Sequence, residues 1–143
     1  MLGAMRCVLT DELRAIHRTR LDREGRKLGR RMLGPSARCA IKLDTDDAVT
    51  GGLVVGEGVE TCLAARQLGF APTWAMGSAG AIGVLPVLPG VEGLTLLAET
   101  DDAGANERAV EACAARWHEA ERDVVIITPN RGDMNDALRE ARP

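Results

Sequence analysis

The chain has 143 residues, of which 45% are hydrophobic and 27% are charged, with a formal net charge of -3. These values are typical of a globular domain with its own core, and no apolar stretch approaches the roughly 20 residues of a membrane-spanning helix, so we expect no membrane contact. The four cysteines are widely separated, which argues against a zinc site and favours reduced thiols in a cytoplasmic protein.

Residues 1–50 are predicted to form a basic, β-rich lead-in. Short strands are expected at residues 5–9, 13–21 and 40–43. Residues 22–26 form a turn in which Gly25 supplies the glycine that a hairpin favours. Gly29, Gly34 and Pro35 interrupt the pattern after that turn.

The lead-in carries most of the positive charge. Residues 1–43 contain eleven Lys or Arg and four Asp or Glu, a net +7, so the remaining residues carry -10. A basic arm on an acidic body is expected where a polyanion is held beside a metal site. The residues predicted to contact nucleic acid are Arg18, Arg20, Arg26, Lys27, Arg30 and Arg31. The alternative is a solvated basic hairpin without a specific ligand.

From residue 51 strands alternate with helices, which predicts that the lead-in is followed by an α/β domain over residues 51–143. Buried strands are predicted at residues 53–55, 73–76, 94–98 and 123–128. Helices are predicted at residues 59–68, 106–120 and 134–141. This alternation implies right-handed crossovers and an α/β fold with a four-stranded parallel sheet flanked by helices.

Carboxylates follow two of these strands. Glu57 lies between two glycines after the first strand, and Glu99 and Asp101 come at the end of the third. Ligands of open α/β sheets bind beyond the carboxyl ends of the strands, so adjacent strands would bring these acids into one crevice. Gathered carboxylates need a counter-charge, and Mg²⁺ or Mn²⁺ is the simplest one. One such cluster alone is better explained by an acid that caps a helix, as at Glu57, but two clusters at equivalent strand ends favour a metal site.

A loop of small residues follows the second strand. Its backbone N–H groups are candidates for holding a phosphate, at Gly77, Ser78 and Gly80. A tight turn explains the same residues, and the chain has no Gly-Lys-Ser/Thr phosphate-loop motif.

The order of these segments resembles the Toprim domain of topoisomerases, primases and related nucleases. Glu57 matches the lone glutamate of that family, and Glu99-x-Asp101 aligns with its Asp-x-Asp, with Glu in place of the first Asp. Residues 132–138 resemble the Lys-Asp-x-Asn-Asp-x-Leu ending of phage and plasmid primase-like Toprim domains, with Gly in place of Lys. Residues 17–35 are similar to the hairpin that precedes the domain in mobile-element primase-helicase proteins.

This resemblance implies a Rossmann-like Toprim fold and Mg²⁺-dependent chemistry on phosphodiesters. It implies catalytic roles for Glu57, Glu99 and Asp101, and metal binding by the same acids together with Asp133. The implied ligands are DNA or RNA and nucleotides, and a helicase or another replication protein is an expected partner. Primase-like nucleotidyl transfer is the leading hypothesis. A Toprim nuclease and a non-catalytic nucleic-acid-binding or regulatory module remain alternatives.

Overall fold

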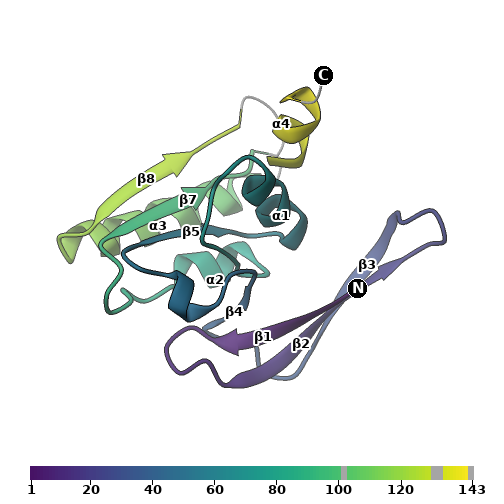
Figure 1. The fold of residues 1–143 in the computed structure, drawn as a ribbon, viewed down its shortest axis with the longest axis horizontal. Coiled ribbons are helices and arrows are strands. Elements are labelled where there is room, and N and C mark those ends of the chain that lie inside the picture. The colour runs from purple at the N-terminus through teal and green to yellow at the C-terminus, as the bar shows by residue number, and fades with distance from the viewer. Residues whose placement is uncertain (101–102, 130–133, 142–143) are drawn as a thin grey trace.

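A computed structural model of the chain describes residues 1–100, 103–129 and 134–141. These residues form one eight-stranded sheet with the strand order β3-β2-β1-β4-β6-β5-β7-β8 (Figure 1). The lead-in builds the antiparallel half of the sheet and the later strands build the parallel half. No helix among the described residues combines the length and the apolar character needed to span a lipid bilayer.

The antiparallel half contains the predicted hairpin, including a second strand whose bounds the sequence did not indicate. Its strands are β1 (Leu2–Cys7), β2 (Leu13–Leu21), β3 (Lys27–Leu33) and β4 (Cys39–Lys42). β3 pairs along β2 but is exposed over its whole length, so it lacks the apolar alternation on which strand prediction depends. The first strand also begins earlier than predicted, at Leu2.

The parallel half confirms the predicted α/β fold. Its strands are β5 (Gly52–Gly56), β6 (Thr73–Ala75), β7 (Gly93–Leu97) and β8 (Asp123–Ile127). β5 lies between β6 and β7, with which it pairs in parallel, and β8 pairs in parallel with β7. Antiparallel pairing of β4 with β6 joins the two halves. Because β5 and β7 are neighbours, the loops that follow them open at the same edge of the sheet.

Helices cover both faces of the parallel half. The helical segments are η1 (Asp46–Ala48), α1 (Val59–Gln67), α2 (Ala79–Gly83), α3 (Ala105–Glu119) and α4 (Met134–Ala141). α2 packs against α3, and α1 packs against α4 (Figure 1). α1 is followed by Gly69, which has a φ of 93° and ends the helix as predicted.

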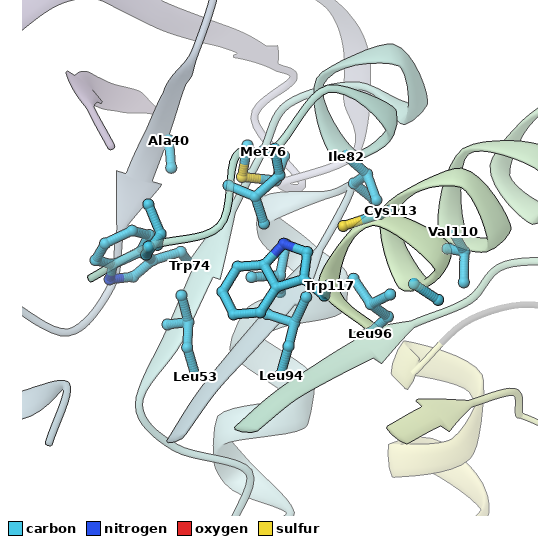
Figure 2. Packing of buried hydrophobic residues seen from close by; sticks show 14 of the residues in the cluster. Ala40, Leu53, Trp74, Met76, Ile82, Leu94, Leu96, Val110, Cys113 and Trp117 are labelled. Carbon is cyan, nitrogen blue, oxygen red and sulfur yellow. The ribbon is translucent and has the colours of Figure 1, made fainter. Parts of the chain in front are cut away.

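Alternate residues of β5 pack into two different hydrophobic cores. Leu53 and Val55 belong to the core under α2 and α3, whose centre is the completely buried Trp117 (Figure 2). Val54 belongs to the second core, under α1 and α4. Both cores also include side chains of the lead-in, so the two halves of the sheet share them. The predicted boundary near residue 50 therefore separates two segments that pack on the same cores, and the division into a lead-in and a following domain stays a prediction.

Candidate active site at the ends of β5 and β7

The neighbouring ends of β5 and β7 bring two of the predicted acids together. Glu57 follows directly after β5, and Glu99 lies two residues beyond the end of β7. Both line one cavity of about 470 Å³, together with Glu60 and Thr61 of α1. The Glu57 side chain is only 16% exposed. Its negative charge is thus largely withdrawn from water and depends on nearby donors and cations.

The two acids are held by polar side chains that the sequence analysis did not select. Asn106, the second residue of α3, is completely buried. Its Oδ1 accepts the backbone N–H of Glu99 at 2.9 Å, and its Nδ2 donates to Oε2 of Glu57 at 3.2 Å. Thr61 Oγ1 donates to Oε1 of Glu99 at 2.9 Å. The end of β7 is therefore tied both to Glu57 and to α1.

The other two predicted metal ligands, Asp101 and Asp133, lie outside the described residues. Within the residues that are described, no group of three His, Cys, Asp or Glu side chains is placed to hold a metal ion. Glu57 and Glu99 line one cavity, and carboxylate oxygens such as theirs are the donors that Mg²⁺ and Mn²⁺ prefer. A complete ligand set that includes Asp101 and Asp133 stays a prediction.

The thiol of Cys62, a residue of α1, does not supply a thiolate ligand to this cavity. Cys62 of α1 is completely buried. Burial raises its pKa to about 12, with a further small effect from the negative charges of Glu99 and Glu60. The thiol therefore stays protonated at neutral pH, and a soft thiolate ligand is not formed there. The chemistry of the donors thus fits a hard cation.

The opposite wall of the cavity is basic and comes from the β2–β3 hairpin. Lys27 Nζ lies 3.1 Å from Oε1 of Glu60, and Arg30 Nη2 lies 3.9 Å from Oε1 of Glu57. Arg30 Nη1 also donates to the carbonyl of Gly77 at 3.2 Å. Burial acts to raise the pKa of Glu60, but hydrogen bonds from its own backbone N–H and from Lys27 outweigh it and hold the pKa below its usual value.

A buried histidine on the same face of the hairpin as Arg30 carries no charge. His17 is 4% exposed, and its Nδ1 has no hydrogen-bond partner among the described residues. Burial lowers the pKa of His17, and the positive charge of Arg30 lowers it further. The imidazole is therefore neutral near pH 7, so the positive charge of this wall comes from Lys27 and Arg30.

Strand alternation places a second set of arginines on the outer face of the hairpin. Arg18 pairs across the strands with Arg31, while the adjacent Thr19 pairs with Arg30. Neighbouring residues of a strand point to opposite faces, so Arg18, Arg20 and Arg31 lie on the face opposite to Arg30. All three are exposed and line a hollow of about 520 Å³, to which Thr19 and Arg30 also contribute. The described residues supply none of them with an ion pair.

Arg26 belongs neither to the basic wall of the cavity nor to the outer arginines. It lies in the turn between β2 and β3, where its Nε is 2.7 Å from Oδ2 of Asp22 and its Nη2 is 3.5 Å from Oε2 of Glu24. The backbone N–H of Arg26 also donates to Asp22 at 2.7 Å. This arginine thus shares its charge with two acids of its own turn, and its contact with nucleic acid stays a prediction.

The predicted phosphate loop begins beside Glu57. The backbone N–H of Gly77 donates to the carbonyl of Glu57 at 2.8 Å, which continues the pairing of β6 with β5. The hydroxyl of Ser78 accepts the N–H of Ala81 at 3.2 Å and caps the short helix α2. The Ser78 side chain is therefore engaged within the loop. Phosphate binding by Gly77, Ser78 and Gly80 stays a prediction.

Comparisons with known proteins agree with this architecture. The crystal structure of a DNA primase domain from Pseudomonas aeruginosa is similar in fold, with a TM-score of 0.57 and 17% sequence identity. The similarity covers 97% of this chain and 53% of that chain, so the chain spans about half the length of that relative. No curated protein matches the chain. A model of the Toprim domain family matches residues 52–142, which is more than half of the sequence, and the chain therefore belongs to the Toprim domain family.

Proposed function

We propose that this chain is a Mg²⁺-dependent catalytic module for phosphodiester chemistry on nucleic acid, acting as a primase-like nucleotidyltransferase in a mobile-element replication protein. The observation that carries the proposal is one cavity with an acidic wall and a basic wall. Glu57 and Glu99 face it from the parallel half, and Lys27 and Arg30 face it from the hairpin. Phosphoryl transfer uses both kinds of group, because carboxylates hold the metal and cations hold phosphate oxygens.

The metal would be Mg²⁺ or Mn²⁺, held by Glu57 and Glu99 together with Asp101 and Asp133. Toprim domains generally bind divalent metals, and the oxygen donors of Glu57 and Glu99 suit such an ion. Once bound, the ion would neutralise charge on the phosphate oxygens and align the reacting groups.

Glu57 is the proposed acid/base group. Its carboxylate faces the cavity, with Oε2 hydrogen-bonded to Asn106 and Oε1 close to Arg30. In primer synthesis it would accept the proton of a 3′-hydroxyl, and in nuclease chemistry the proton of water. Lys27 and Arg30 would exchange their carboxylate partners for phosphate oxygens, to which they form charge-assisted hydrogen bonds.

The outer arginines are proposed to hold the backbone of the template strand. Arg18, Arg20 and Arg31 lack ion-pair partners among the described residues, so a polyanion would meet uncompensated charge. Base stacking would contribute little, because the chain has one Phe, two Trp and no Tyr, and Trp74 and Trp117 are buried. A helicase or another replication protein, acting with this module in the cytoplasm, would supply the remaining replication functions.

Product analysis tests the proposal. The chain is incubated with single-stranded DNA, nucleoside triphosphates and Mg²⁺, and the products are separated on a denaturing gel. New primers support the primase assignment. Shortened or nicked strands indicate a Toprim nuclease instead. Absence of any product, with DNA binding that is equal in chelator and in Mg²⁺, indicates a non-catalytic binding module.

Glu57→Gln and Asp101→Asn test the metal site. Each removes one negative ligand, so we expect Mn²⁺ affinity, followed by electron paramagnetic resonance, to fall in both. Loss of the acid/base group should also lower product formation by about 10²–10⁴-fold in Glu57→Gln. Glu111→Gln removes the same charge from an exposed position of α3 and serves as the control. Unchanged Mn²⁺ affinity in both site variants would overturn the proposed function.

A further inference from the structure

We infer that Asn106 is the positioning residue of this site: its carboxamide holds Glu57 against the end of β7 and thereby sets the spacing of the two acids that bind the metal. This inference rests on the proposed metal-dependent function. Asn106 does not bind the metal itself. It acts through Glu57 and through the backbone of Glu99.

The position of Asn106 in α3 explains why its side chain reaches the site. α3 begins at Ala105, directly after Gly104, so Asn106 lies in the first helical turn. Side chains of a helix lean towards its N-terminus, which here lies beside the end of β7. The side chain is completely buried and joins Glu99, seven residues earlier, to Glu57, 49 residues earlier. A single amide thus links two strand ends that are far apart in the sequence.

The chemistry of the two partners determines how the amide is oriented. A backbone N–H can only donate, so the group that faces Glu99 must be Oδ1. An ionised carboxylate can only accept, so the group that faces Glu57 must be Nδ2. Both requirements are met by the same side chain, at 2.9 Å and 3.2 Å. An alanine would satisfy neither partner, and the hydroxyl of a serine is too short to reach both.

The identity of the partners distinguishes positioning from ordinary core packing. A buried asparagine that only stabilises the fold needs partners of any kind. Here one partner is a carboxylate that faces the cavity, and the other is the backbone of the second cavity acid. Thr61 holds the Glu99 carboxylate from α1, whereas Asn106 joins the Glu57 carboxylate to the backbone at the end of β7. Residues that orient metal ligands in this way typically change metal affinity by 10–100-fold when they are replaced.

The test is a Mn²⁺ titration of the full chain, followed by electron paramagnetic resonance, with Asn106→Ala alone and combined with Glu57→Gln. We expect Asn106→Ala to weaken Mn²⁺ binding by about 10–100-fold. In the Glu57→Gln background, Asn106→Ala should weaken Mn²⁺ binding little further, because the carboxylate that Asn106 positions has already been removed. Additive losses would assign Asn106 a structural role and overturn the inference.

The control variant is Cys113→Ala, which truncates another completely buried side chain of the same helix. It should lower the midpoint of urea unfolding without weakening Mn²⁺ binding, and an equal loss of affinity in this control would overturn the inference.

If Asn106→Ala does not fold, Asn106→Ser is titrated in its place with the same expectation. A wild-type chain that binds no Mn²⁺ refutes the proposed function. A chain that loses binding in Glu57→Gln but keeps it in Asn106→Ala refutes the inference alone.

Discussion

The residue before Glu57 determines how closely α1 and β7 approach the end of β5. A Cβ atom on Gly56 would lie 2.8 Å from Sγ of Cys62 and 3.2 Å from Cδ1 of Leu97, both of which are completely buried. Gly52, at the start of the same strand, has no such neighbour within 4 Å. The glycine at position 56 is therefore required by close packing beside the site, whereas the one at position 52 is not.

Gly56→Ala should lower the free energy of unfolding by about 1–3 kcal/mol, because the added methyl group overpacks a filled core. Gly52→Ala is the matched control and should stay within about 0.5 kcal/mol of wild type. Urea unfolding measures both. Combining Gly56→Ala with Cys62→Ala should reduce the loss that Gly56→Ala causes, since the nearest atom is removed. Equal effects of the two glycine substitutions would contradict the packing argument.

At the scale of the element, the β2–β3 hairpin carries two kinds of basic residue on two faces. Its inner face brings Lys27 and Arg30 to the acids of the cavity. Its outer face carries the arginines that form no ion pair with any described residue, Arg18, Arg20 and Arg31. The sequence shows one basic cluster, and only the pairing register of the two strands divides it. The inner and outer sets should therefore respond differently to substitution.

Replacing Arg18, Arg20 and Arg31 together by Gln should weaken binding of single-stranded DNA and lower the slope of log affinity against log salt by about 2, because three phosphate contacts are lost. Fluorescence anisotropy over a series of salt concentrations measures the slope. Mn²⁺ affinity should stay at the wild-type value, since this face is turned away from the acids. Arg38→Gln removes one exposed arginine from the turn before β4 and is the control. A slope that does not change would refute the assignment of the outer face.

At the scale of the whole molecule, the two halves of the sheet meet at β4 and β6. The carboxylate of Asp44, which follows β4, accepts the backbone N–H of Thr73 at 2.8 Å and lies 2.7 Å from Nη2 of Arg66. The carbonyl of Asp44 accepts Nε1 of Trp74 at 2.9 Å. Lys42 lies over the ring of Trp74, with 4.5 Å between Nζ and the ring centroid. These contacts attach the lead-in, and with it the basic wall, to the acidic half of the site.

Because the halves share one sheet and both core clusters, the chain should unfold in a single transition. Asp44→Ala should lower its stability by about 2 kcal/mol, since donors at the junction lose their acceptor. Circular dichroism and tryptophan fluorescence should report the same lowered midpoint. Asp47→Ala, at an exposed position in η1, is the control. Two separate midpoints would show that residues 1–50 fold as an independent domain.

The sequence by itself was sufficient for most of the fold and for locating Glu57 and Glu99 at one edge of the sheet. Buried parallel strands are apolar on both faces, so β5 and β7 were recognised from their apolar runs, and the helices were recognised from their periodic patterns. The apolar run of β8 also predicted a buried strand, but β8 lies at the edge of the sheet, where Val125 and Ile126 are 55% and 45% exposed. Carboxylates directly after such runs mark the binding edge of the sheet, which is why Glu57 and Glu99 could be selected. The bounds of β3, the second strand of the predicted hairpin, could not be read from the sequence because the strand is exposed throughout and lacks apolar alternation.

Only the tertiary structure decided which residues meet. Asn106 looks in the sequence like any polar residue at the start of a helix, and its partner Glu57 is 49 residues away. Arg30 likewise looks like its neighbour Arg31, yet the pairing of β3 with β2 turns Arg30 towards Glu57 and Arg31 away from it. Local patterns encode burial and conformation over a few residues. Contacts between distant side chains depend on strand order and register, which are decided only when the whole sheet assembles.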